Sequence, residues 1–337
     1  NDLRQRTGAG LMDCKKALTE AAGDMEKAVE ILRIKGVATR NKKADRKASE
    51  GILAVNVSAD GRAATLLELN CETDFVAKNE NFIALAKELV GQAAANGADG
   101  LLEQPYHADK SRKVNDYLND QVLKIGENLK VSRVLKFEAT GVGRVSAYVH
   151  TGAKIAVLLE LGLKTQAAAA NPEVAELARQ LAMQVVANNA RFVRREDVSP
   201  DVVAKEREIA AEFTKSEADK AIDEAKRIVE DYKGQLVEQK AANDAEAIAE
   251  LEKRIAVGEK QVIAAEGRKK GQLSNMEKII SGRVDKFFAD SCLLEQAYFR
   301  DPEQKIQALI AAAKGKVGEE VSIVRFTRFQ VGETAAE

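Results

Sequence analysis

The chain has 337 residues, 45% of them apolar, and 52 basic residues face 53 acidic ones for a net charge of −1. A protein that grips a nucleic-acid backbone usually shows a basic excess, so this balance argues against direct nucleic-acid binding. No run of about 18 apolar residues occurs, so we expect no membrane span. The length suggests two or three domains.

Side chains suited to catalysis are sparse. The cysteines lie far apart without a C-x-x-C pair, at Cys14, Cys71 and Cys292, which indicates buried thiols in a reducing compartment. The histidines are His107 and His150, and no zinc-ligand spacing joins them to the cysteines. No phosphate-binding loop motif is present, and Gly141-Val142-Gly143 lacks the third glycine of a dinucleotide fingerprint. We expect no covalent chemistry, no metal and no cofactor.

The first residues predict a small helical bundle extending to about residue 36. Asp13 is a candidate cap for one helix, and Gly23-Asp24 for the next. A basic stretch follows, made of Arg40, Lys42, Lys43, Arg46 and Lys47. This stretch could bind nucleic acid, but the near-zero net charge of the whole chain favours a solvated linker or helix face between domains. We place the N-terminal domain at 1–48.

A strand-and-helix unit comes next and is then repeated. Residues 52–57 and 64–69 flank Ala59-Asp60-Gly61, which is a hairpin signal, and a helix follows from about Asn79 through Leu89. A shift of 92 residues brings 66–69 onto 158–161. We infer two related subdomains of an α+β fold, at 49–140 and at 141–205 with 281–337. A strand at 321–326 is expected to join the second sheet.

Residues 206–280 predict an inserted antiparallel coiled-coil hairpin. Apolar residues step by three and four along each arm: Ala218, Ile222, Ala225, Val229, Tyr232 and Leu236, then Ile248, Leu251, Ile255, Val262 and Ala265. Each arm of about 26 residues would project about 39 Å. In such a hairpin the two arms either bury only each other's apolar seam and leave a solvated outer face, or the hairpin also supports a homodimer or an additional contact with a partner.

The loop between strand and helix differs between the two copies. The first carries Asp74-Phe75 within Asn70–Lys78, where the second has Gln166-Ala167 within Gly162–Ala170. If Phe75 packed a core common to both copies, Ala167 would leave a hole. The alternatives are that Phe75 staples its own helix with Asp74 as cap, or that this tip contacts a partner.

Several separated motifs resemble the signature of the elongation factor Ts family. The first is Thr73-Asp74-Phe75-Val76-Ala77-Lys78 followed by Asn81-Phe82. The others are the N-terminal stretch from Arg4 to Leu18, Lys124-Ile125-Gly126-Glu127-Asn128, the turn from His150 to Ile155, Glu196-Asp197-Val198-Ser199, and the stretch from Arg325 to Glu333. Their order along the chain matches as well.

The resemblance implies a guanine nucleotide exchange factor for elongation factor Tu in its nucleotide-free or GDP form, with a bundle similar to ubiquitin-associated domains. In that family the Asp-Phe tip enters the partner's GTPase domain near the bound magnesium. Carried over, Phe75 is the wedge and Asp74 its companion, flanked by Thr73 and Val76. His150 matches the residue associated with displacing the phosphate-binding loop. Further matching contact residues are Ile125, Gly126, Arg4, Leu11 and Met12, although one of Leu11 and Met12 is also expected in the bundle core.

The sequence leaves two rival functions open. One is a ubiquitin-like-fold binding module or scaffold, suggested by the bundle and the hairpin. The other is a phosphate-handling enzyme that uses Asp74 and His150. We expect a cytoplasmic protein, with an organellar matrix or stroma as the alternative compartment.

Overall fold

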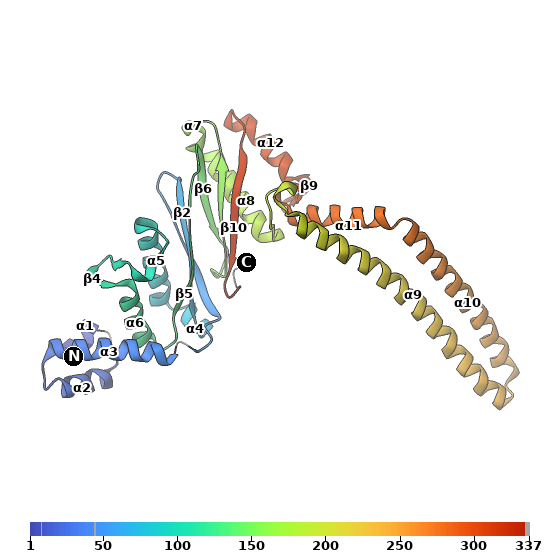
Figure 1. Ribbon diagram of the computed structural model, residues 1–337, viewed down its shortest axis with the longest axis horizontal. Helices are drawn as coiled ribbons and strands as arrows, with labels where there is room; N and C mark the ends of the chain where they lie inside the picture. Colours follow the sequence, from blue (N-terminus) through green and yellow to red (C-terminus); the bar gives the residue numbers. More distant parts are fainter. Residues whose placement is uncertain (8, 44, 334–337) are drawn as a thin grey trace. The chain divides into compact units, whose positions relative to one another are not determined.

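The computed structural model describes residues 1–7, 9–43 and 45–333, with the side chains of 37–42 left out. The fold mixes helices and antiparallel sheets, as expected for the α+β class (Figure 1). The chain divides into two compact units: 1–193 with 297–337, and 194–296. No described helix combines the length and the apolar character that crossing a bilayer demands.

The N-terminal helices pack around a small core. They are α1 (Asp2–Thr7), α2 (Leu11–Glu20) and α3 (Met25–Lys43), and their core consists of Leu3, Ala9, Cys14, Ala17, Ala21, Ala28 and Leu32. Asp24 caps α3 as predicted, since its Oδ1 accepts the N–H groups of Glu26 and Lys27 at 3.0 and 3.1 Å. The prediction that Asp13 caps α2 is wrong, because that helix begins at Leu11 and follows Gly10.

The basic stretch belongs partly to α3, which continues to Lys43 rather than ending near residue 36. The side chains of Arg40 and Lys42 lie outside the described part. Lys43 donates to the carbonyl of Gly126, and Arg46 lies 3.6 Å from the Glu72 carboxylate. These two cations therefore contact the neighbouring subdomain.

The first copy has a three-stranded antiparallel sheet in the order β1-β2-β5. Its elements are β1 (Glu50–Val57), β2 (Ala63–Cys71), α4 (Asp74–Ala77), α5 (Glu80–Asn96), η1 (Leu101–Glu103), β3 (Pro105–Tyr106), β4 (Asp109–Lys113), α6 (Val114–Ile125) and β5 (Lys130–Glu138). Strand β2 is buried along most of its length, because helices cover one face of the sheet and the second sheet covers the other. Helix α5 extends seven residues beyond the predicted end at Leu89.

The second copy repeats these elements. A shift of 92 residues gives β6 (Gly143–Val149), β7 (Ile155–Gly162), α7 (Gln166–Ala169) and α8 (Pro172–Asn188). A shift of 192 residues gives η3 (Leu293–Glu295), β8 (Ala297–Tyr298), β9 (Asp301–Lys305), α12 (Ile306–Val317) and β10 (Ser322–Gln330). The insertion therefore falls inside the second copy. As predicted, the last strand joins its sheet, in the order β10-β7-β6.

Glycine is required at the equivalent positions Gly51 and Gly143. A Cβ at Gly51 would overlap the carbonyl oxygen of Leu69, and one at Gly143 would overlap that of Leu161. Gly51 also has a φ of +152°, which an L side chain rarely adopts. The repeat of these glycines in the sequence thus reflects a close approach of two backbones.

The two sheets pack face to face through reciprocal contacts. Arg133 of the first copy binds the buried Glu68 at 2.7 Å and lies 4.0 Å from the ring centroid of Phe329 in the second. The second copy mirrors this arrangement: Arg325 binds the buried Glu160 at 2.7 Å and lies 4.2 Å from the ring centroid of Phe137. A shared apolar layer, which includes Leu53, Leu66, Val145 and Leu158, fills the interface. The copies are therefore joined with approximate two-fold symmetry.

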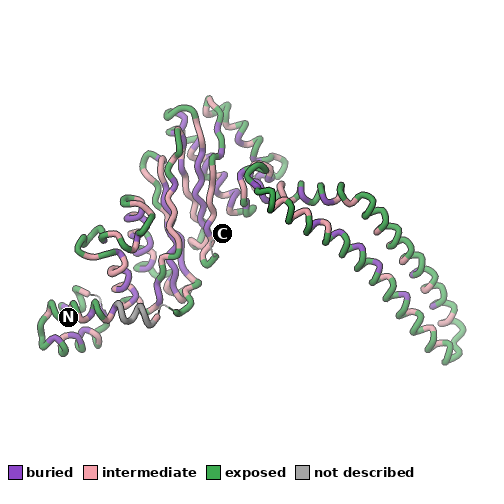
Figure 2. The backbone as a smooth tube through the Cα atoms, viewed as in Figure 1, coloured by how far each residue is buried: buried purple, intermediate pink, exposed green. Residues whose placement is uncertain are grey.

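The second unit contains the predicted helical hairpin. It comprises η2 (Arg195–Asp197), α9 (Pro200–Ala242), α10 (Ala245–Ser274) and α11 (Met276–Ser291), together with η3. Helices α9 and α10 pack as an antiparallel pair, and Figure 2 shows buried and half-buried positions recurring along both. The arms are longer than the predicted 26 residues, with 43 in α9 and 30 in α10. This unit extends beyond 206–280 because α11 packs along the start of α9, around Ala210, Ile280 and Val284.

Candidate functional site

The loop after β2 forms a short capped helix. Thr73 is the N-cap of α4, and its hydroxyl accepts the N–H of Val76 at 3.3 Å. Threonine is a favoured residue at this position because its side chain satisfies a helix donor that otherwise lacks a partner. Asn79 then caps α5, accepting the N–H of Asn81 at 2.8 Å. Two caps in quick succession fix the path of the loop.

Phe75 projects from this helix into solvent. It is 83% exposed, more than any other large hydrophobic side chain in the described part of the chain. On the other face of α4, Ala77 is buried and Val76 packs against the core. Phe75 therefore does not staple its own helix, and Thr73 rather than Asp74 is the cap. The alternative in which Phe75 packs on its own helix and Asp74 caps it is therefore wrong in both parts.

Asp74 forms an exposed ion pair with Lys78, one helical turn further on. The distance from Lys78 Nζ to Asp74 Oδ2 is 2.7 Å. The hydrogen bond from Lys78 holds the pKa of Asp74 below its ordinary value, so the carboxylate is ionised at neutral pH. The tip thus presents an aromatic ring beside a fixed negative charge.

A carboxylate from elsewhere in the chain braces the loop. Glu127 Oε2 accepts the N–H groups of Glu72 and Thr73, each at 3.1 Å, and its Oε1 accepts the Thr73 hydroxyl at 2.6 Å. In return, Glu72 accepts the N–H of Asn128 at 2.7 Å. Two segments more than 50 residues apart are therefore locked together.

The loop of the second copy has the same scaffold without the tip. Thr165 caps α7, and Glu319 accepts the N–H groups of Lys164 and Thr165 at 2.7 and 3.1 Å and the Thr165 hydroxyl at 3.0 Å. Ala167, at the position of Phe75, is exposed, so no cavity replaces the ring. The copies share backbone and brace and differ in what they display.

The turn that carries His150 lies against the same strand as α4. The N–H of Leu53 in β1 donates to the carbonyl of Ala153 at 2.8 Å, and α4 packs on β1 as well. The His150 side chain is exposed, with its Nδ1 3.2 Å from the hydroxyl of Tyr148. The structure therefore brings this turn and the Phe75 loop to the same strand.

Other predicted contact residues are distributed differently. Ile125 is half-buried against the first-copy core, and Gly126 ends α6 with a φ of +86°. Arg4, on α1, is exposed. Leu11 and Met12 are 59% and 60% exposed on α2, so the prediction that one of them belongs to the bundle core is wrong.

Cys71 lies directly beneath the braced loop. Its side chain is fully buried, and the thiol donates to the carbonyl of Thr73 at 3.2 Å. Burial, and next the nearby Glu127 carboxylate, raise the pKa of this thiol to about 12. The thiol is therefore a protonated structural group, in line with the expectation from the sequence. Cys14 and Cys292 are buried as well, without disulfides.

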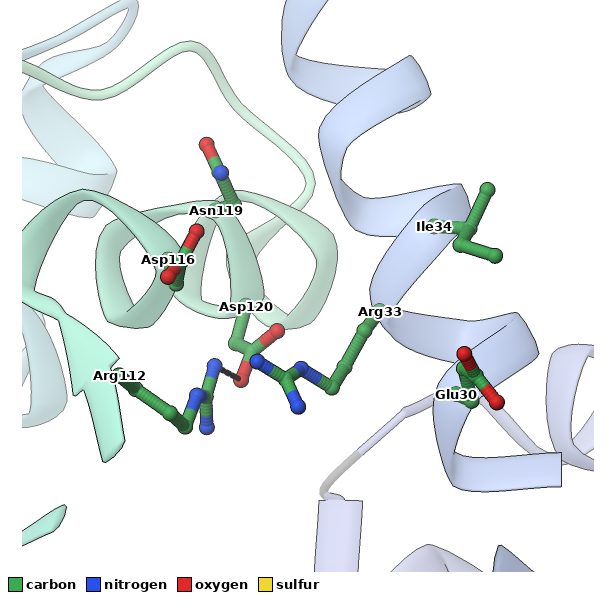
Figure 3. A pocket seen from close by; sticks show the side chains of 7 residues that line it. All are labelled: Glu30, Arg33, Ile34, Arg112, Asp116, Asn119 and Asp120. Atoms are coloured by element: carbon green, nitrogen blue, oxygen red, sulfur yellow. Dashed lines mark hydrogen bonds and ion pairs between the residues drawn. The ribbon is translucent and has the colours of Figure 1, made fainter. Parts of the chain in front are cut away.

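A separate cavity of about 320 Å³ lies between α3 and the β4–α6 region (Figure 3). Its lining residues are Glu30, Arg33, Ile34, Arg112, Asp116, Asn119 and Asp120. Arg112 pairs with Asp120 at 2.6 Å, and the Arg33 guanidinium points toward the same carboxylate. The lining thus contains three carboxylates and two guanidinium groups, a mixture of charges that suits neither a phosphate nor an apolar ligand.

Sequence reasoning missed the bracing residues. The sequence assigned no role to Glu127, Glu72 or Glu319. A signal was present, because the dipeptide Gly-Glu recurs at 126–127 and 318–319 with the spacing that relates the two copies. The brace itself depends on a contact between distant segments, which the one-dimensional pattern does not reveal.

An aromatic side chain fixed in solvent on a capped and braced loop can anchor a protein partner. The fold and this loop therefore indicate the class of proteins that bind another protein.

Comparisons with known proteins identify the family. The model of the family described as Elongation factor TS matches residues 72–250 and 235–333. The chain is 37% identical over 335 residues to elongation factor Ts of Nostoc sp., which covers 98% of this chain and 90% of that protein. It is 38% identical over 332 residues to elongation factor Ts of Symbiobacterium thermophilum, with coverage of 98% and 90%. The chain belongs to the elongation factor Ts family, whose members are elongation factors of protein biosynthesis.

Proposed function

We propose that this protein accelerates the release of GDP from elongation factor Tu by inserting the Asp74-Phe75 tip beside the partner's magnesium and phosphate site. Membership of the family supports the exchange role and the partner. The observation that carries the mechanism is the 83% exposure of Phe75 on a braced loop, whose twin displays alanine instead.

The physical basis is competition for the same region of the partner. Magnesium and the phosphate-binding loop hold a diphosphate through charge-assisted contacts that depend on exact geometry. An inserted phenyl ring gains about 2 kcal/mol from burial, and a small displacement of the loop weakens several phosphate contacts together. Coupling is reciprocal: a tenfold loss of nucleotide affinity on binding the factor means a tenfold loss of factor affinity on binding nucleotide, about 1.4 kcal/mol. Incoming nucleotide therefore expels the factor.

The remaining predicted residues take two kinds of role in this proposal. Exposed side chains suit direct contact with the partner: His150, Arg4, Leu11 and Met12, together with the half-exposed Asp74. Thr73, Val76, Ile125 and Gly126 are proposed as partner contacts that also have a structural place in this chain. Thr73 caps α4, Val76 and Ile125 pack partly against the first-copy core, and Gly126 ends α6. No step requires a nucleophile or a proton transfer, so the protein is an exchange factor without covalent chemistry.

We assign these roles to the N-terminal domain at 1–48 and the first subdomain at 49–140. The second subdomain, at 141–205 and 281–337, supplies the His150 turn and supports the first through the interface between the sheets. We assign no role in the exchange step to the insertion at 206–280.

The direct test is the release of fluorescent GDP from elongation factor Tu, followed with and without the protein. We expect a large acceleration that saturates with the concentration of the factor. A scaffold or ubiquitin-like module would bind without accelerating release. A phosphate-handling enzyme would convert the nucleotide, which chromatography of the products would detect. Either outcome would reject the exchange function.

For His150 we expect a smaller contribution, about three- to tenfold in the release rate, which corresponds to about 1 kcal/mol. The variant His150→Ala measures it, and Tyr148→Phe controls for loss of the neighbouring hydroxyl contact. A wild-type rate for His150→Ala would remove this residue from the mechanism.

Self-association through the hairpin stays a prediction. The hairpin carries exposed apolar side chains outside its seam, of which Val237 and Ile263 are each 69% exposed. If they form a homodimer contact, sedimentation of the full chain will show a dimer, and a chain lacking 215–272 will sediment as a monomer. An identical association state of both chains would exclude the hairpin as the dimer contact.

A further inference from the structure

The tip loop is held by one carboxylate that belongs to neither the loop nor its strand. Glu127 follows α6 and accepts three hydrogen bonds from the two residues before the tip: both backbone N–H groups and the Thr73 hydroxyl, at 2.6 to 3.1 Å. Hydrogen bonds to an ionised acceptor are the stronger kind. One side chain thus fixes the backbone at the point where α4 begins.

The brace is doubled by bonds in the opposite direction. Glu72 accepts the N–H of Asn128 at 2.7 Å, so the loop and the segment after α6 hold each other. Asn128 also donates from its side-chain amide to the carbonyl of Arg46 at 2.9 Å. Hydrogen bonds therefore link the loop, the segment after α6 and the end of the N-terminal domain.

We propose that Glu127 is a positioning residue for Phe75, which keeps the exposed ring in the single orientation needed to enter the partner. The inference rests on the proposed exchange function. It adds a role for a side chain that is not expected to touch the nucleotide site. Because a mobile wedge must lose conformational freedom as it inserts, a fixed loop lowers the free-energy cost of insertion.

The second copy provides a matched control. Glu319 makes the same three hydrogen bonds, to Lys164 N, Thr165 N and the Thr165 hydroxyl, and the helix that it braces displays Ala167. Removing either carboxylate costs the fold a similar set of contacts. Only removal of Glu127 loosens a loop that carries the wedge.

The experiment compares Glu127→Ala, Glu127→Gln and Glu319→Ala in the full chain. Fluorescent GDP release from elongation factor Tu is measured as a function of factor concentration, which separates the maximal rate from the half-saturating concentration. We expect Glu127→Ala to lower the maximal rate at least tenfold with a smaller change in half-saturation, because the other contacts with the partner remain. Glu127→Gln should recover part of the rate, since its amide oxygen still accepts. Glu319→Ala should stay within about twofold of the wild type.

Two further readouts separate positioning from general damage. Hydrogen exchange at the Thr73 amide should accelerate in Glu127→Ala, while circular dichroism and thermal unfolding should resemble those of Glu319→Ala. In a chain that already carries Phe75→Ala, adding Glu127→Ala should cause almost no further loss, because the brace acts through the ring.

The inference is overturned if Glu127→Ala keeps the wild-type maximal rate, if Glu319→Ala loses as much, or if the effect of Glu127→Ala persists undiminished without Phe75. If Glu127→Ala does not fold, a wild-type rate for a folded Glu127→Gln whose Thr73 amide exchanges faster overturns it equally. These failures leave acceleration by the wild type intact and so differ from failure of the exchange function, in which the wild type itself is inactive and the inference falls as well.

Discussion

The loop after β2 and the loop after β7 have the same backbone structure and the same supporting hydrogen bonds but expose different side chains. Both begin with a threonine cap and are followed by an asparagine cap. Both are braced by a glutamate from a distant part of the chain, after α6 in the first copy and after α12 in the second. The first displays Asp74, Phe75 and Lys78, and the second displays Gln166, Ala167 and Ala170. Since the shared parts explain the fold of the loop, the residues that differ are the ones to examine for function.

The largest expected effect comes from exchanging the tip residues between the copies. Phe75→Ala should lower the GDP release rate about a hundredfold, the loss typical of a central aromatic in an interface. Ala167→Phe should leave the rate unchanged, because the second loop is assigned no role at the nucleotide site. The assay is fluorescent GDP release at saturating factor.

Stability provides the control for this pair. Phe75 is mostly exposed, so Phe75→Ala should change the free energy of unfolding by less than about 0.5 kcal/mol. A large loss of stability, or an equal loss of activity in both variants, would contradict a specific role of the exposed Phe75 ring in GDP release.

A smaller effect is expected for the acid beside the ring. Asp74→Asn should lower release about tenfold, within the range for a charged interface contact, whereas Gln166→Ala in the second loop should have no effect. Because the bond from Lys78 depresses the pKa of Asp74, its charge persists at neutral pH and is lost only as the pH falls through that lowered value. The ratio of wild-type to Asn-variant rates should therefore be constant between about pH 6 and 8. A ratio that changes within that range would show that another group titrates.

The smallest expected signal comes from Cys71 and concerns the rigidity of the first loop. Its pKa of about 12 lies well above the ordinary 9.0, so at pH 8 its thiolate fraction is about a thousandfold smaller than that of a free cysteine. Iodoacetamide should consequently label Cys71 in the unfolded chain and leave it unlabelled in the native one, as read by peptide mass mapping. Rapid labelling of the native protein would mean that the braced loop opens freely.

Much of the fold could be predicted from local patterns. The hairpin signal at Ala59-Asp60-Gly61 and the heptad spacing depend on neighbouring residues, and the shift of 92 residues is visible as similarity between two segments. The structure confirms the elements that these patterns indicate. Strand β5, helix α6 and their repeats β10 and α12 complete each copy across a spacing of 192 residues. The insertion separates this second part of the repeat from the first, and only its last strand was predicted from the sequence.

The candidate site was predicted in part. The contrast between Phe75 and Ala167 identified the tip because the copies could be compared position by position. The exposure of Leu11 and Met12 depended on how the helices of the bundle face one another, and the role of Glu127 depended on its contact with Thr73, 54 residues away. Such contacts depend on how distant segments pack together, and the spacing of residues along the sequence does not reveal this.

The structure of the complex with nucleotide-free elongation factor Tu tests the proposed insertion of Phe75 most directly. We expect the Phe75 ring to be buried in the partner's GTPase domain, next to the empty magnesium and phosphate site, while Ala167 on the second loop stays in solvent. A complex in which Phe75 remains as exposed as in the free chain would contradict it.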